Sequence, residues 1–143
     1  MIDILPGIHS TTSALNAERI RMDVVGQNIA NLNTTRGLDG RPYQRQQVVF
    51  ETLLNQHIGD ATGSMPESVN VARIEKDQRP PKLVYSPGHP DANAEGMVAM
   101  PDINMAEEMV DLITASRSFE ANLAVMKNAR AMALQTLTIG KRL

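Results

Sequence analysis

The chain has 143 residues, and its 14 Lys plus Arg against 16 Asp plus Glu give a formal net charge of -2 at pH 7. Both signs are dispersed along the sequence, so the concentrated basic face that nucleic-acid binding requires is missing. The absence of Cys excludes disulfides, thiolate nucleophiles and Cys-ligated metals. Two Phe, two Tyr and no Trp leave aliphatic side chains and nine Met to form the core.

The first residues lack the marks of a targeting segment. Residues 1–6 contain no basic n-region, and no apolar h-region follows them, so we expect no cleaved secretory signal. No apolar run approaches the roughly 20 residues that span a bilayer, so we expect no direct membrane insertion. If the chain leaves the cytoplasm, another export route must carry it.

Near the N-terminus, apolar residues recur every seven positions, and two more follow three positions after the last two. They are Ile8, Leu15, Met22 and Ile29, with Val25 and Leu32. This spacing places the side chains on one narrow helical face, as in a coiled coil. Pro6-Gly7 interrupts the chain, and a hydroxyl within residues 10–12 can cap a helix. We therefore predict a helix from about Thr11 to about Asn31, ended by the Asn- and Thr-rich residues 31–37.

The middle of the chain lacks this period. Seven of the eight Pro residues lie between Gly40 and Pro101, which excludes a long helix there. β-branched and aromatic residues predict short strands at 43–51, 69–75 and 82–85. Turn-forming residues separate them at 59–64 and 86–88. We expect an irregular, β-rich insert.

The heptad spacing returns after Pro101. Apolar residues repeat every seven positions, with others four positions after a member of that series: Met105, Leu112, Phe119, Met126 and Ala133, then Met109, Leu123 and Leu137. Asn104 can cap the helix and Glu107 can complete a capping box. Acidic residues at the start complement the helix dipole. The helix should reach Thr138 and stop at Gly140, a length of roughly 50 Å.

The predicted fold is mainly α with a β-rich insert. Residues 1–36 and 102–143 form long terminal helices in an antiparallel, coiled-coil-like pair, and residues 37–101 form the insert. A two-helix pair leaves much of its apolar surface uncovered, so neighbouring subunits are expected to cover it. Contacts between unlike faces of identical subunits generate open helical arrays.

No residues form a credible catalytic, cofactor or metal site. His9, His57 and His89 do not share the close spacing of a helical metal pair. His89 beside Asp91 suggests a base or a ligand, but the surrounding Pro and Gly favour a shaped turn with local hydrogen bonds. The acidic cluster of Glu107, Glu108 and Asp111 is read as dipole complementarity in preference to a cation site.

Several stretches carry a family resemblance. Residues 13–19 and 24–34 resemble the N-terminal signature of bacterial flagellar axial proteins, which include rod and hook subunits. Residues 42–45, 85–93 and 96–101, with 107–111 and 115–122 near the C-terminus, resemble the proximal-rod subtype of that family. The signature residues are Asn28, Ala30, Asn31, Asn33 and Thr34, and then Pro87, Gly88, His89, Pro90 and Asp91.

The resemblance implies a structural subunit of the proximal rod, a tube that transmits torque to the hook and filament and surrounds the export channel. It implies type III export without a cleaved signal and a place in the periplasm. The implied partners are other copies, other rod proteins and the inner-membrane ring or export apparatus. The stripe residues would then pack subunits together. The alternatives are a coiled-coil adaptor that forms a small closed oligomer, and an enzyme that uses His89 and Asp91.

Overall fold

The computed structural model describes residues 6–37, 39–53 and 68–140. Along the chain, four short strands lie between two helices. The elements are α1 (Pro6–Ala30), β1 (Gln46–Leu53), β2 (Ser68–Lys76), β3 (Lys82–Tyr85), β4 (Met97–Met100) and α2 (Met105–Gly140). The predicted order of long helix, strands and long helix is confirmed. His57 and the turn expected at 59–64 lie outside the described residues.

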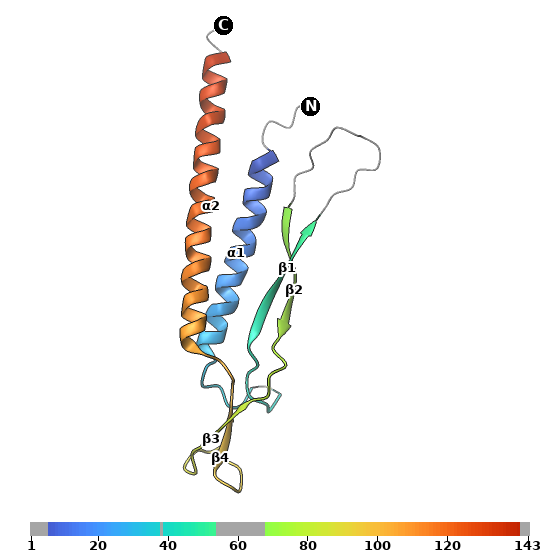
Figure 1. The fold of residues 1–143 in the computed structure, drawn as a ribbon, viewed down its shortest axis with the longest axis vertical. Helices are drawn as coiled ribbons and strands as arrows, with labels where there is room; N and C mark the ends of the chain where they lie inside the picture. The colour runs from blue at the N-terminus through green and yellow to red at the C-terminus, as the bar shows by residue number, and fades with distance from the viewer. Residues whose placement is uncertain (1–5, 38, 54–67, 141–143) are drawn as a thin grey trace.

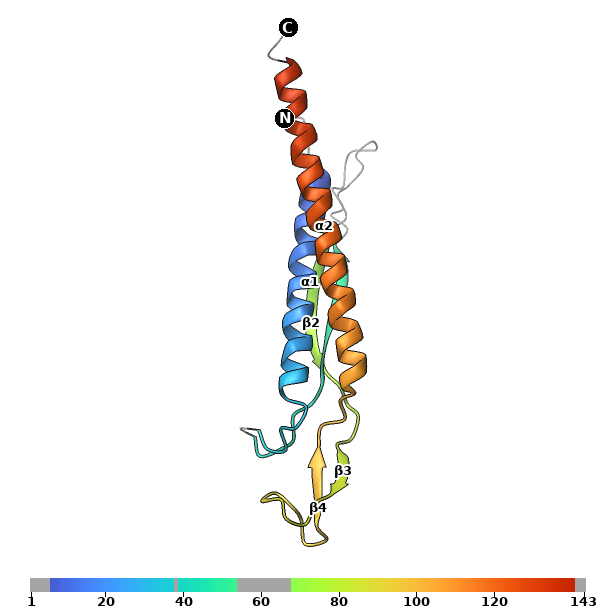
Figure 2. The same cartoon turned by 90° about the vertical axis from the view of Figure 1, so that its left-hand side faces the viewer.

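The two helices lie side by side and run in opposite directions (Figure 1). The β1–β2 hairpin packs against α1, which lies between the hairpin and α2 in the view of Figure 1. The β3–β4 pair lies beyond the end of the helices where α2 begins (Figure 2). Within the described ranges, neither helix is long and apolar enough to cross a membrane.

The prediction that α1 begins near Thr11 was wrong, because the helix begins at Pro6. A Pro is compatible with a first helical turn, where its fixed φ suits the helix and its missing N–H would have had no intrahelical acceptor. The hydroxyls expected to cap lie inside the helix. Thr12 Oγ1, for example, donates to the Ile8 carbonyl at 2.7 Å.

The predicted end of α1 is confirmed to within one residue. Asn31 Nδ2 donates to the Gln27 carbonyl at 2.9 Å, and the Asn31 backbone N–H donates to the same carbonyl at 3.0 Å. Thr34 Oγ1 in turn donates to Asn31 Oδ1 at 3.1 Å. These short polar side chains end the helix by bonding locally, as the sequence suggested.

The start of α2 also follows prediction. Asn104 Oδ1 accepts a hydrogen bond from the Ala106 N–H at 3.1 Å, so Asn104 is the N-cap. The capping box is altered, since Glu107 Oε1 accepts from the Asn104 side-chain amide at 3.2 Å. At 36 residues, α2 is roughly 54 Å long against roughly 38 Å for the 25 residues of α1. Its C-terminal end consequently extends past the start of α1 (Figure 1).

The strands form two separate antiparallel pairs. β1 pairs with β2 from Gln46↔Lys76 to Leu53↔Ser68, with a register shift between Val49 and Phe50. β3 pairs with β4 from Lys82↔Met100 to Tyr85↔Met97. The sequence predicted the first three strands but not β4, which contains one β-branched residue, Val98, and no aromatic residue.

A glycine closes the loop between β3 and β4. Gly96 has a φ of 75°, and an added Cβ would lie 3.1 Å from the Tyr85 ring and from the Pro87 side chain. Both the backbone conformation and the space therefore favour glycine at this position.

The core is small and lies mainly along α1. Ala17, Val24 and Val25 of α1 and Ala115 of α2 are buried, and Val98 is buried in β4. Small side chains of this kind let helices approach closely. Two polar residues, Asn28 and Glu108, are as deeply buried as these apolar ones, and they belong to the site described next.

Candidate functional site

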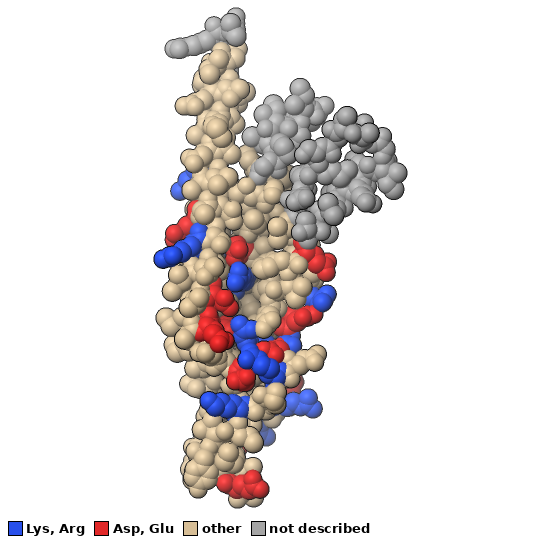
Figure 3. Space-filling view, in the orientation of Figure 1, with Lys and Arg blue, Asp and Glu red and all other residues tan. Residues whose placement is uncertain are grey.

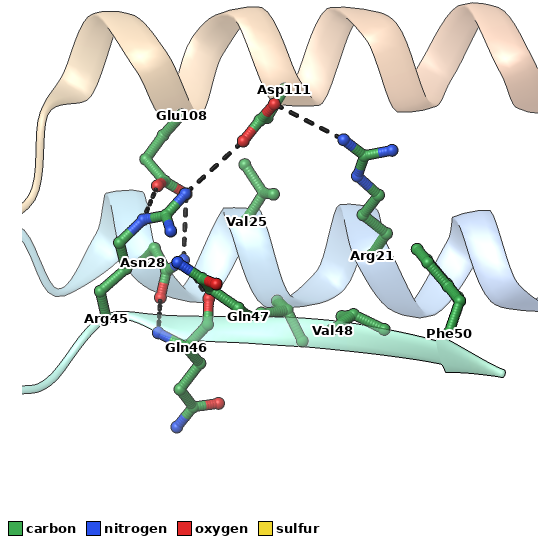
Figure 4. A pocket seen from close by; sticks show the side chains of 11 residues that line it. Arg21, Val25, Asn28, Arg45, Gln46, Gln47, Val48, Phe50, Glu108 and Asp111 are labelled. Carbon is green, nitrogen blue, oxygen red and sulfur yellow. Dashed lines mark hydrogen bonds and ion pairs between the residues drawn. The ribbon is translucent and has the colours of Figure 1, made fainter. Parts of the chain in front are cut away.

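Five side chains form a polar clasp where α1, α2 and the start of β1 meet (Figure 4). The clasp consists of Arg21 and Asn28 from α1, Arg45 from the residue before β1, and Glu108 and Asp111 from the first turns of α2. Arg45 Nε lies 2.5 Å from Glu108 Oε1, and Arg45 Nη2 lies 3.5 Å from Asp111 Oδ2. Arg21 Nη2 adds the last ion pair of the series, at 3.5 Å from Asp111 Oδ1.

The charges of the clasp are balanced, and the Arg45–Glu108 pair is largely shielded from water. The Glu108 side chain is 0% exposed and that of Arg45 is 14% exposed. Burying a charge costs several kcal/mol unless an opposite charge and hydrogen bonds compensate. Glu108 receives both, because Asn28 Nδ2 donates to its second oxygen, Oε2, at 3.0 Å.

The Asn28 amide joins the clasp to the β1–β2 hairpin. Its Nδ2 donates to the Gln46 carbonyl at 2.9 Å, and its Oδ1 accepts from the Gln46 N–H at 2.9 Å. Tyr43 donates its hydroxyl to the same Oδ1 at 3.0 Å. Together with the bond to Glu108, these contacts use both donors and both acceptor positions of the amide. An Asn at this position in the sequence signature therefore has a defined structural role.

Tyr43 is held in its protonated form by the surroundings of the clasp. Burial raises the pKa of the Tyr43 phenol above its ordinary value of 10.0, and the negative charge of Glu108 raises it further. The neutral hydroxyl is the form that donates to Asn28.

A groove of about 460 Å³ opens beside the clasp, between α2 and β1. Apolar side chains of α1 and β1 line it together with the clasp: Val24, Val25, Val48 and Phe50. Within residues 6–37, 39–53 and 68–140, no cluster of three His, Asp or Glu side chains is arranged to hold a metal ion.

The sequence reading of the acidic cluster needs correction. Glu107 is exposed and contacts the cap, as dipole complementarity and capping predict, but Glu108 and Asp111 bind guanidinium groups. Neither Arg21 nor Arg45 was among the predicted site residues. Arg45 did fall within the signature stretch 42–45, but local spacing gives no sign of a partner 63 residues away.

The Pro-Gly-His-Pro-Asp loop forms the shaped turn that the sequence predicted. His89 Nδ1 accepts a hydrogen bond from the Asp91 N–H at 3.1 Å. Asp91 also reaches the segment after α1, where Thr35 Oγ1 donates to Asp91 Oδ2 at 2.8 Å and Arg36 Nη1 lies 3.7 Å from Oδ1. Both side chains are engaged in holding the loop, which favours a structural role over a catalytic one.

The other signature residues divide between turns and surface. Asn31 and Thr34 bond to each other at the end of α1. The rest are exposed on the single chain: Ala30, Asn33, Pro87, Gly88 and Pro90.

The heptad stripes are covered only in part by the partner helix. Val25 is buried, and a larger group is half-buried: Ile8, Leu15, Met22, Ile29, Leu32, Leu112, Phe119, Leu123 and Met126. Met105, Met109 and Leu137 are 49%, 49% and 65% exposed. The buried residues Glu108 and Ala115 show that α2 presents a face slightly rotated from the predicted stripe.

Comparison with known proteins identifies the class of protein through matches at both ends of the chain. Residues 8–36 match a family model described as flagella basal body rod protein. Residues 94–139 match the model of the flagellar basal body rod FlgEFG protein C-terminal region. The chain has the terminal regions of a flagellar rod protein, in the expected order.

Full-length relatives narrow the assignment. The chain is 40% identical to the flagellar basal-body rod protein FlgC of Borreliella burgdorferi, over 95% of this chain and 97% of the relative. Identity is 44% to FlgC of Escherichia coli, over 90% and 92%, and 40% to FlgC of Bacillus subtilis, over 94% and 96%. The chain therefore belongs to the FlgC family of flagellar basal-body rod proteins. It is a structural subunit of the rod in the basal body, and not an enzyme.

Proposed function

We propose that the chain assembles through its terminal helices into the proximal part of a helical rod, alongside other copies and other rod subunits. In this proposal, α1 and α2 form a coiled-coil-like inner layer around the export channel. The strands form an outer layer, and the packed tube carries torque from the motor toward the hook and filament. The subunit reaches the periplasm by type III export without a cleaved signal.

The observation that carries this proposal is the C-terminal part of α2, which extends beyond α1. Residues 131–140 contain no Lys, Arg, Asp or Glu. In the view of Figure 3, the end of α2 carries neither positive nor negative side chains, whereas both gather around the start of α2 and the strands. A helical segment that is apolar on all sides is normally buried against other protein.

Apolar residues cover more than one face of this segment. Met132, Leu134, Leu137 and Ile139 are 62%, 54%, 65% and 66% exposed. At 100° per residue, Met132 and Ile139 lie within roughly 20° of each other, and Leu134 and Leu137 lie roughly 200° and 140° around the axis from Met132. One partner helix covers one face only, so this geometry favours neighbours on at least two sides, as in a polymer.

Further exposed residues of the stripes fit the same proposal. Met105 and Met109 lie at the other end of α2, half exposed beside Val110 and Ile113. We propose that they and the half-buried stripe residues pack against neighbouring subunits. The division of the chain into residues 1–36 and 102–143 inside, with 37–101 outside, belongs to the same proposal.

A single charged substitution tests the proposal without disturbing the fold. Leu137→Asp places a charge on a side chain that the single chain leaves 65% exposed. We expect an unchanged melting temperature, together with loss of motility and of co-assembly with purified rod subunits in negative-stain images. Ala94→Asp is the control, because Ala94 is exposed in the β3–β4 loop, and it should preserve all three.

Two results would contradict the proposal. One is normal motility and co-assembly of Leu137→Asp. The other is a small, closed oligomer of the unmodified chain in sedimentation experiments, with no incorporation into rods, which would support the coiled-coil adaptor.

A further inference from the structure

We infer that the polar clasp sets the axial register between α1 and α2, and that Arg45 is the residue that positions the start of α2. Arg45 is well suited to this role because it comes from neither helix. It lies at the start of the β1–β2 hairpin and reaches Glu108 and Asp111 at once. A third segment thereby fixes where one helix lies along the other.

The apolar stripes alone leave the register open. If α2 shifts by seven residues along α1, Phe119 takes the place of Leu112 and Met126 that of Phe119. Each exchange replaces one apolar side chain with another, so the apolar contacts barely distinguish the two alignments. Buried polar groups are the best-attested means by which helical pairs select one alignment.

The clasp distinguishes the two alignments clearly. In the shifted pair, Ala115 replaces Glu108 opposite Asn28, and Ser118 replaces Asp111 opposite Arg21. Arg45 and Asn28 would then keep their shielded positions without a carboxylate. Glu108 is 0% exposed in the observed alignment, and its two oxygens bind Arg45 and Asn28 separately.

The register has a direct consequence for assembly, and this consequence rests on the proposed function. A shift of seven residues moves α2 by roughly 10 Å. It would shorten by that amount the uncharged segment that extends past α1. The clasp is therefore inferred to determine how much of α2 each subunit presents to its neighbours.

Spin-label distances on the full chain test the register without depending on rod assembly. The chain has no Cys, so Asn16→Cys on α1 and Gln135→Cys on α2 give two defined labels at exposed positions. With the clasp intact, pulsed dipolar spectroscopy should give a single distance. When Arg45→Met and Glu108→Met are introduced into the labelled chain, we expect unchanged helical content. We also expect a second population in which the distance between the labels is shorter by up to roughly 10 Å.

An exchange of two residues provides a second, independent variant. Glu108→Ala/Ala115→Glu moves the carboxylate one heptad along α2 and keeps the composition, so the shorter distance should predominate. The matched control is Arg73→Met/Glu75→Met, which removes an exposed ion pair within β2 and should leave the single distance unchanged.

The results that overturn the inference are distinct from failure of the proposed function. A single, unshifted distance in both clasp variants would show that the connecting segments set the register. Several distances in the chain with an intact clasp would show that nothing fixes it. Loss of helical signal in both variants would make the clasp a requirement for helix formation instead of a selector of register.

Discussion

Replacing Glu108 with Ala should destabilise the chain far more than replacing an ordinary acidic residue near a helix N-terminus would. The substitution removes a carboxylate that is 0% exposed and accepts hydrogen bonds from Arg45 Nε and Asn28 Nδ2. It leaves the Arg45 guanidinium shielded from water and deprived of its nearest negative charge.

The magnitude follows from what remains around Arg45. Removing one partner of a buried ion pair costs about 3–5 kcal/mol. Arg45 keeps Asp111 at 3.5 Å and is itself 14% exposed, which places the expected loss near the lower end, at about 3 kcal/mol. For a chain of this size, that loss lowers the melting temperature by roughly 6–12 °C. Reversible urea unfolding followed by far-UV circular dichroism measures it.

The neighbouring residue supplies the matched control. Glu107 is in the same helical turn and carries the same charge, but it is exposed, and its carboxylate accepts a hydrogen bond from the Asn104 side chain. Glu107→Ala should cost about 0.5 kcal/mol through the helix dipole. If the two substitutions lower the free energy of unfolding by the same amount, the reasoning fails, because dipole complementarity would then account for both residues.

Two further predictions concern the cap and the buried phenol. Asn104→Ala should lower the free energy of unfolding by about 1 kcal/mol through loss of the cap on the Ala106 N–H, and an unchanged urea midpoint would contradict the assigned cap. The raised pKa of Tyr43 means that the folded state holds the phenolic proton more tightly than the unfolded state. The stability linked to this group is therefore complete below pH 10.0 and falls as pH rises from there through the folded-state pKa. Urea unfolding across this pH range should show the loss of stability due to Tyr43 in the unmodified chain and not in Tyr43→Phe. Parallel curves of unfolding free energy against pH for the two chains would refute this prediction.

The sequence predicted the presence of both helices better than the start of α1 and the face that α2 presents. Asn104 could be identified as a cap because the partners of its side chain, Ala106 and Glu107, are within three residues along the chain. Pro6 was read as a break, although a first helical turn accepts Pro without loss of a hydrogen bond. Heptad spacing gives the period of a stripe but leaves its angular position uncertain, which is why Met109 is 49% exposed while Ala115 is buried.

The clasp could not be predicted because its signals are distant in sequence. Glu108 has the composition of an ordinary acidic first turn, and nothing near it reveals Arg45. Asn28 was recognised through the signature, but its bonds to Gln46 and Glu108 depend on the tertiary fold. Short β-strands such as Met97–Met100 are similarly defined by their pairing partner more than by their own residues.

The separation between Asn28 and Glu108 also affects when the chain can fold. Their hydrogen bond joins residues 80 positions apart, so it cannot form on a growing chain until at least 108 of the 143 residues have been made. Until then α1 lacks the partner helix that covers its apolar stripe, and a lone helix of this length is marginal in water. A shortened chain that ends before α2 would accordingly remain without the finished helical pair, so synthesis itself delays the formation of that pair.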